Sequence, residues 1–223
     1  MNLRARVLIP AYNECAQIGG LVRRVKSMGF YPLVVDDGSK DGTSEEAGKN
    51  GAEIIRHEEN MGKGISLKTG FARILKKDCD AVIIMDGDAQ HSPDDIPKFI
   101  DAANKYQNTI IIGNRMNNAK NMPFSRKLTN NFMSFLVSLF CGQKVPDSQC
   151  GFRLIKRDLL EKITIKSSRF EIESDILIQA GRAGVKIVSI PIKTLYGKEA
   201  SQINPFWDTL RFIVFLIKTS FTK

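Results

Sequence analysis

Short apolar runs alternate with longer segments of helical periodicity along the first half of the chain. Apolar residues recur at helical spacing over 13–28 and 64–77, and Ser92-Pro93 begins a further helix. The apolar runs predict five β-strands, at 6–10, 33–35, 53–55, 81–85 and 109–112. Strands that alternate with helices in this way predict an α/β fold: a doubly wound, mostly parallel sheet with flanking helices.

The second half has a different rhythm. Residues 114–122 are polar and rich in Asn, which predicts a loop. We expect residues 150–155 to return to the sheet, followed by a helix over 173–183 and a last strand over 186–192. Residues 125–141 predict an amphipathic helix with this apolar stripe: Leu128, Phe132, Phe135, Leu136, Leu139 and Phe140.

A second amphipathic helix is predicted over 205–221. Its apolar side combines aromatic and aliphatic residues: Phe206, Trp207, Leu210, Val214, Ile217 and Phe221. Two interpretations stay open for both helices, because such a stripe can pack on the sheet or lie in a bilayer interface without crossing it. For the tail, contact with a second copy of the chain, as a homodimer, is a third.

Composition restricts the class of protein. With 223 residues, 43% hydrophobic and 26% charged, the chain suits one globular α/β domain. We expect neither a signal peptide nor a membrane-spanning helix, and the four Cys lack CxxC spacing, which favours reduced thiols. The net charge is −1 over residues 1–110 and +10 over 111–223. A basic second half indicates an anionic partner: nucleic acid, a phospholipid surface or a phosphorylated substrate.

Acidic residues follow several of the predicted strands. Asn13-Glu14 follows the first, Asp36-Asp37 the second, and Asp86 the fourth. Any one of them could be a helix N-cap. Because ligands bind beyond the carboxyl ends of the strands in such sheets, their joint presence on one rim favours a ligand site.

The Asp86-Gly87-Asp88 segment is the sharpest of these features. Two carboxylates one residue apart, just past a buried strand, can approach one cation, and Gln90 adds another oxygen. Hard oxygen ligands in an open site suit Mg²⁺ or Mn²⁺ bridging substrate phosphates. The chain has no GxxxxGK[ST] or GxGxxG segment, which disfavours P-loop NTPases and NAD enzymes.

At this point the sequence resembles the family 2, GT-A fold, glycosyltransferases. The resemblance rests on VLIPAYNE at 7–14, VVDDGSKDGT at 34–43, GKG at 62–64 and MDGDAQH at 85–91. Three later segments resemble the branch of dolichol-phosphate mannosyltransferases and polyprenyl-phosphate glycosyltransferases: DSQCGFR at 147–153, FEIE at 170–173 and YGKEASQI at 196–203.

The resemblance implies a role for each matching residue. The nucleotide would be held by Pro10, Tyr12, Glu14, Val35, Asp37, Asp86 and Gly87. The metal and diphosphate would be bound by Asp86, Asp88 and Gln90. The catalytic residues would be Asp88, Asp147 and Arg115, and Arg115 would contact a phosphate. The acceptor phosphate would meet Arg126, Lys198 and Ser201, with Glu173 on the sugar and acceptor side.

The implied reaction is an inverting transfer of one sugar, most simply mannose from GDP-mannose, to a polyprenyl or dolichyl phosphate. A lipid phosphate is already ionised near neutral pH, so it needs cations and no general base. The rival is transfer to a hydroxyl of a glycan or glycolipid, with Asp147 as base. The chain departs from the branch at Ser201-Gln202, where Ser-Lys is common, and it has no QxxRW segment, which favours a single transfer.

These inferences combine into one organisation. Residues 1–204 form a catalytic domain, with a nucleotide-binding half at 1–113 and an acceptor half at 114–204, and 205–223 form the tail helix. We expect a cytoplasmic protein held peripherally on the membrane face. A nucleic-acid partner is disfavoured, because no nucleic-acid-binding module is recognisable and the acidic rim would repel phosphates unless a metal is bound.

Overall fold

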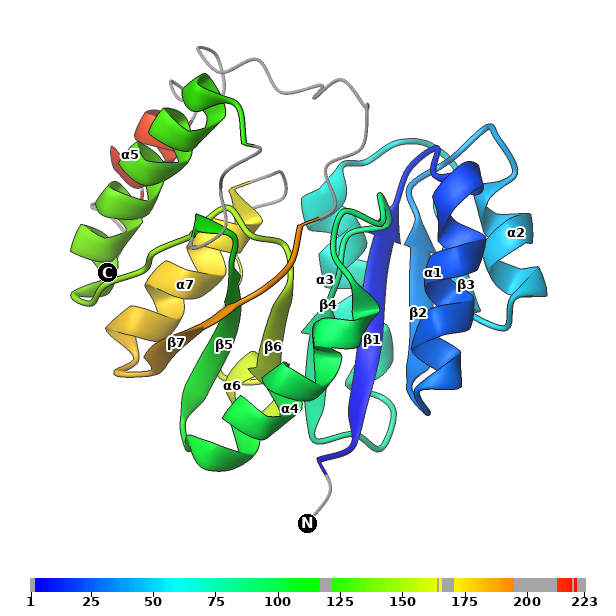
Figure 1. The fold of residues 1–223 in the computed structure, drawn as a ribbon, viewed down its shortest axis with the longest axis horizontal. Coiled ribbons are helices and arrows are strands. Elements are labelled where there is room, and N and C mark those ends of the chain that lie inside the picture. Colours follow the sequence, from blue (N-terminus) through cyan, green and yellow to red (C-terminus); the bar gives the residue numbers. More distant parts are fainter. Residues whose placement is uncertain are drawn as a thin grey trace.

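The computed structural model describes residues 3–116, 122–163, 165, 171–194, 212–217 and 219. A seven-stranded sheet runs through the centre in the order β3-β2-β1-β4-β6-β5-β7 (Figure 1). The strands are β1 (Ala5–Ala11), β2 (Tyr31–Asp36), β3 (Glu53–Arg56), β4 (Ala81–Ile84), β5 (Thr109–Asn114), β6 (Arg153–Lys156) and β7 (Lys186–Pro191).

The sheet is parallel except at β6, which is inserted antiparallel between β4 and β5. The other neighbouring pairs, β1 with β2 and β4, β2 with β3, and β5 with β7, run parallel. The predicted doubly wound, mostly parallel sheet is therefore confirmed. All five strands expected in the first half form, within one or two residues of their predicted ends.

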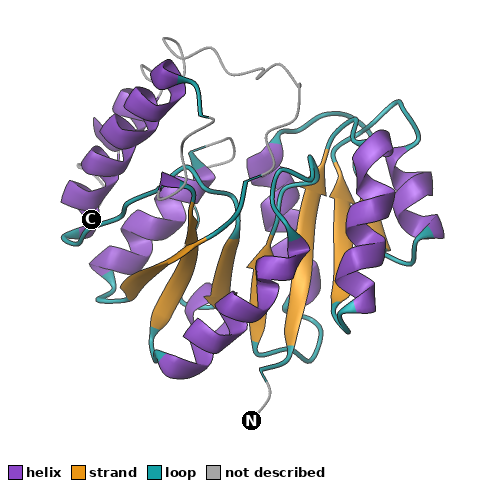
Figure 2. Cartoon of the chain, viewed as in Figure 1, coloured by secondary structure: helices purple, strands orange, loops and turns teal. Residues whose placement is uncertain are grey.

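Helices cover both faces of the sheet (Figures 1 and 2). The helices are α1 (Cys15–Ser27), α2 (Thr43–Lys49), α3 (Lys63–Ile74), α4 (Ile96–Lys105), α5 (Phe124–Cys141), α6 (Arg157–Leu160) and α7 (Ile172–Arg182). A short 3₁₀ helix, η1 (Pro93–Asp95), precedes α4, and the Ser92 hydroxyl caps it by accepting from the Asp94 N–H. The short helices α2 and α6 were not predicted, because one or two turns show no periodicity.

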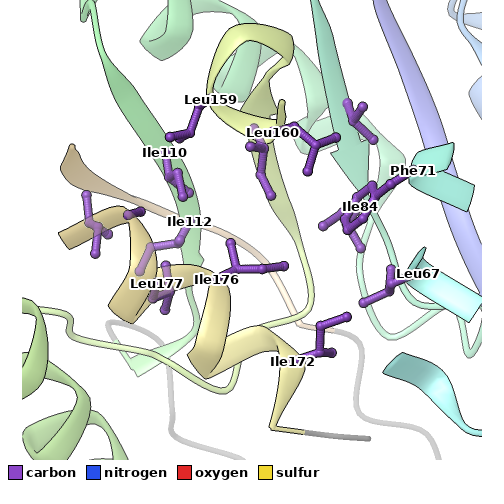
Figure 3. Packing of buried hydrophobic residues seen from close by; sticks show 14 of the residues in the cluster. Leu67, Phe71, Ile84, Ile110, Ile112, Leu159, Leu160, Ile172, Ile176 and Leu177 are labelled. Carbon is purple, nitrogen blue, oxygen red and sulfur yellow. The ribbon is translucent and has the colours of Figure 1, made fainter. Parts of the chain in front are cut away.

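Strand side chains alternate between two apolar cores. Leu8 lies in the core beneath α3 and α7, whereas its neighbours Val7 and Ile9 lie in the core beneath α1 and α4. In the first core, α3, α6 and α7 pack against β4 and β5 (Figure 3). This two-sided burial explains why the central strands are almost continuously apolar.

Helix α5 packs on the core through a face other than the stripe noted in its sequence. Its buried face carries Met133, Val137 and Cys141, which join the core over α7. Most of the stripe noted in the sequence is exposed, and Phe124 extends it: Phe124 80%, Leu128 61%, Phe132 45%, Phe135 60% and Leu139 62%. Of the interpretations left open for this stripe, packing on the sheet does not hold for these residues, whereas Leu136 and Phe140 do pack partly against the core.

The tail is described over residues 212–217 and at 219. Phe212 and Leu216 are buried in the core, whereas Val214 and Ile217 are about half exposed. The Arg182 guanidinium on α7 donates to the Thr219 carbonyl over 2.8 Å and fastens the tail. Phe206, Trp207, Leu210 and Phe221 lie outside the described residues. Among the described helices, none combines the length and apolarity needed to cross a bilayer.

Candidate active site

The carboxyl ends of β1, β2 and β4 meet at one edge of the sheet. The Asp37 N–H donates to the Ala11 carbonyl over 2.9 Å, and the Met85 N–H donates to Leu8 over 3.0 Å. These bonds place the segments after β1, β2 and β4 side by side. Tyr12 is 40% exposed here, and Glu14 immediately precedes α1, so both lie at this rim.

Asp37, the predicted nucleotide contact that follows β2, forms its hydrogen bonds with groups of the protein itself. The Asp37 carboxylate, 3% exposed, accepts from the N–H groups of Met61 (3.0 Å) and Gly62 (2.7 Å). It also pairs with His57 Nδ1 over 2.8 Å, while His57 Nε2 lies 3.1 Å from the Thr69 hydroxyl. Asp37 therefore fastens the segment that leads into α3.

Pro10 and Val35 lie within buried parts of β1 and β2. Val35 is fully buried in the core beneath α3. A ligand at the rim can meet these strands through their backbone ends, whereas the Val35 side chain packs inside.

Two glycines let the Asp86-Gly87-Asp88 turn sit close to its neighbours. A Cβ on Gly87 would lie 3.0 Å from Ala11 Cβ, and a Cβ on Gly151 would lie 2.3 Å from Asp86 Oδ2. The Asp86 carboxylate thus rests against the Gly151 backbone. Asp88 accepts from the Gln90 N–H over 3.0 Å, across Ala89, whose φ of 53° closes the turn.

Lys63 was not predicted as a site residue, yet it lies at the centre of the site. It is the first residue of α3, and its Nζ lies 2.6 Å from Asp86 Oδ1 and 2.6 Å from Glu173 Oε1 on α7. Burial disfavours the charged ammonium, but the two carboxylates outweigh it and raise the pKa of Lys63. Burial likewise disfavours the charged Asp86, and Lys63 outweighs it and lowers the pKa of that carboxyl.

His91 lies behind Asp86. Its Nε2 is 4.0 Å from Asp86 Oδ2, and the ring is 3% exposed and next to Phe152. Burial lowers the pKa of His91 to about 4, against the opposing pull of Asp86. The imidazole is therefore neutral near neutral pH and adds no charge to the site.

Arg115 and Asp147 form a buried, two-pronged ion pair. Arg115 donates from Nε and Nη2 to the two Asp147 oxygens over 2.8 Å each, and its backbone N–H donates over 3.0 Å. Asn130 Nδ2 on α5 donates to the same carboxylate over 3.1 Å. Burial raises the pKa of Asp147, but Arg115 outweighs it and the net shift is downward.

Arg153 organises the segment between Asp147 and α7. It is fully buried, and its guanidinium donates to the carbonyls of Cys150 (2.7 Å), Ser148 (2.6 Å) and Glu173. Its Nη2 also lies 3.8 Å from Glu173 Oε2. Arg153 therefore sets the position of Gly151 against Asp86 and of Glu173 against Lys63.

The predicted acceptor residues are only partly covered by the structure. Arg126 lies on the first turn of α5 and is half-buried. Lys198 and Ser201 lie outside the described residues. The arrangement of all three around one phosphate stays a prediction.

The residues at the rim fit a divalent cation that is held jointly with a substrate. Among the described residues, no group of three or more His, Cys, Asp and Glu side chains is preassembled to enclose a metal. Asp86, Asp88 and Gln90 supply oxygen ligands alone, and Mg²⁺ sites of this composition are completed by substrate phosphates. The ammonium beside Asp86 shows that this carboxylate already stabilises a cation.

A mostly parallel sheet with a carboxylate turn at its carboxyl edge is the arrangement of a GT-A fold transferase of nucleotide-activated sugars. The comparison with family models agrees: the model described as "Glycosyl transferase family 2" matches residues 6–164. The chain belongs to this family.

Curated relatives and solved structures extend the comparison. The chain is 33% identical over 213 residues to the UDP-N-acetylglucosamine–dolichyl-phosphate N-acetylglucosaminyltransferase of Methanococcus voltae, covering 85% of each. It is 28% identical over 205 residues to the undecaprenyl-phosphate mannosyltransferase of Micrococcus luteus, covering 85% of this chain and 83% of the relative. Glucosyl-3-phosphoglycerate synthase of Mycobacterium tuberculosis, solved with Mn²⁺, UDP and phosphoglyceric acid, shares the fold: TM-score 0.70, 16% identity, covering 94% of this chain and 74% of that one.

Proposed function

We propose that this protein is an inverting transferase that moves one sugar from a nucleoside diphosphate sugar to a polyprenyl or dolichyl phosphate. The observation that carries the proposal is the Asp86–Asp88 turn at the carboxyl edge, next to a strongly basic acceptor half. Residues 102–146 contain six Lys and Arg and no Asp or Glu. The relatives from M. voltae and M. luteus, named for lipid-phosphate acceptors, support the same substrate class.

The chemistry follows from charge. Departure of the nucleoside diphosphate leaves negative charge, which a divalent ion at Asp86, Asp88 and Gln90 would stabilise. Arg115, held in place by Asp147, would supply a fixed positive charge near the departing diphosphate. The acceptor phosphate is its own nucleophile and needs to be positioned by cations.

The rival acceptor, a sugar hydroxyl, needs a general base. Asp147 is fully buried, and both of its oxygens accept from Arg115. A base must lie within hydrogen-bond reach of the substrate proton. This enclosure favours the phosphate acceptor and a positioning role for Asp147.

For the donor we propose GDP-mannose, with UDP-N-acetylglucosamine as the second candidate because the M. voltae relative is named for it. The test is a screen of labelled GDP-, UDP- and CDP-sugars with Mg²⁺ or Mn²⁺, each offered a polyprenyl phosphate or a glycan. Transfer of label into the organic phase with one donor supports the proposal. Label that goes only to the glycan overturns it.

Arg126→Ala should raise the KM for the lipid phosphate by about tenfold to a hundredfold, because a charge-assisted hydrogen bond contributes about 1.5–3 kcal/mol. The nucleotide affinity should stay nearly unchanged. Lys144→Ala, which removes an exposed cation near the opposite end of α5, is the matched control. The reverse pattern, a weakened nucleotide and an unchanged lipid KM, would assign Arg126 to the donor.

We also propose peripheral attachment to a cytoplasmic membrane face through α5. Its exposed stripe of Phe124, Leu128, Phe132, Phe135 and Leu139 follows one side of the helix. Arg126 and Lys127 lie at its start, with no acidic residue in α5. An apolar stripe with basic flanks suits an anionic bilayer surface. Association with a second copy through this stripe is the alternative outcome.

Leu128→Ser combined with Phe135→Ser should lower binding to anionic vesicles about tenfold or more, because two exposed apolar side chains lose their burial in lipid. Co-sedimentation at low and high salt measures it, and binding should weaken with salt. Tyr31→Ser, an exposed residue at the far end of the sheet, is the control. If the protein stays in the supernatant when it is mixed with vesicles at low salt, and is a dimer in solution, the stripe is a dimer contact.

A further inference from the structure

We propose that the Lys63 ammonium occupies part of the metal site as a counter-cation of Asp86. A divalent ion must displace this ammonium from Asp86 before it can bind there. Metal would then bind well only together with the nucleoside diphosphate. The inference rests on the metal assignment in the proposed function and adds Lys63 as the residue that sets metal affinity. It follows from the geometry and charge around Asp86.

Lys63 connects the two halves of the molecule. Its Nζ lies 2.6 Å from carboxylates on the β4–η1 segment and on α7, which are 87 residues apart in sequence. The three side chains are 19% (Lys63), 24% (Asp86) and 11% (Glu173) exposed. A cation at the first position of a helix opposes the helix dipole, so α3 gives Lys63 no electrostatic benefit there. The two carboxylates provide the compensation.

The site is close to electrically balanced without a metal, with one carboxylate in excess. The charged groups are three cations, Lys63, Arg115 and Arg153, and four carboxylates, Asp86, Asp88, Asp147 and Glu173. Adding a divalent cation would leave an excess of positive charge in a poorly solvated site, which is unfavourable.

Two events relieve this excess. Displacement of Lys63 from Asp86 frees a carboxylate for the metal, and the diphosphate of the donor brings compensating negative charge. The ammonium and the metal compete for Asp86, so the free protein should bind metal weakly. Binding of metal and diphosphate together should be strongly cooperative, and this coupling is reciprocal.

The test measures Mn²⁺ binding directly, by the loss of the free-ion electron paramagnetic resonance signal, with and without GDP or UDP. Lys63→Met should bind Mn²⁺ at least tenfold more tightly than the wild type when no nucleotide is present. Lys63→Arg, which keeps the cation, and Lys76→Met, an exposed lysine just after α3, should bind like the wild type. Nucleotide should tighten Mn²⁺ binding strongly in the wild type and weakly in Lys63→Met.

The shift in Tm on adding Mn²⁺ is a second measurement, which can be made even if Lys63→Met folds poorly. Removal of Lys63 leaves Asp86 without its ammonium partner and Glu173 with Arg153 alone, so Mn²⁺ should raise the Tm of Lys63→Met more than that of the wild type. Equal Mn²⁺ affinity and equal Tm shifts in the two proteins overturn the inference. Wild-type protein that binds no Mn²⁺ even with either nucleotide overturns the metal assignment of the proposed function instead.

Discussion

Replacing Asp88 by Asn should lower kcat for sugar transfer about a thousandfold, the scale of losing a pre-organised electrostatic contact in a transition state. Asp88 lies on the rim, and its Oδ1 accepts from the Gln90 N–H. Asn keeps that acceptor, so the turn should survive. The variant removes one negative charge from the proposed metal site, and the expected loss is in chemistry. Initial rates with labelled donor and thermal unfolding measure the two effects separately.

The control is Asp94→Asn, which neutralises an exposed carboxylate on η1 that pairs with Arg24. It should retain wild-type activity. Substantial activity of Asp88→Asn, or full wild-type activity in excess EDTA, would reject the metal role assigned to the Asp86–Asp88 turn.

Replacing Arg115 by Met should destabilise the protein by about 3–5 kcal/mol, the cost of leaving a buried charge without its partner. Asp147 loses both prongs of the guanidinium and keeps the Arg115 backbone N–H and Asn130. The variant should also lose nearly all activity if Arg115 has its proposed role as the fixed cation beside the leaving diphosphate. Denaturant unfolding and kcat measure the two effects.

The double variant Arg115→Met with Asp147→Asn separates stability from catalysis. Neutralising the stranded carboxylate should restore much of the stability and none of the activity. Restored activity would make Arg115 a purely structural residue. Since the folded-state pKa of Asp147 is lowered, the stabilisation of the wild type is present above about pH 4 and is lost as the pH falls through that lower value. The double variant should therefore show a weaker acid dependence of unfolding.

The sequence alone determined the framework of this protein. Runs such as 81–85 are apolar because β4 is covered on both faces, and that burial is visible in local composition. The rule that parallel strands end at one edge then brought Glu14, Asp37 and Asp86 to a common rim before any coordinates were known. The family motifs at 7–14, 34–43 and 85–91 lie on those same segments.

What each carboxylate does at the rim was decided by tertiary structure. The resemblance implies a nucleotide contact for Asp37 and a catalytic role for Asp147, and the structure adds that both carboxylates are buried and accept from protein donors. Lys63 stands in the GKG segment at 62–64 that contributed to the family resemblance, but the sequence assigned it no role. Its partners Asp86 and Glu173 come from distant segments that only the folded chain brings within 2.6 Å of it. Long-range charge pairing leaves no period in the sequence.

Helix α5 shows the same division. Periodicity correctly predicted a helix ending at Cys141, because helical spacing is a local property. It could not show which side would face α7, since both sides carry apolar residues. Packing against the core selected Met133, Val137 and Cys141 and left the Leu128–Phe135 side exposed. The shape of the neighbouring surface makes that choice, and it exists only after the sheet and α7 have assembled.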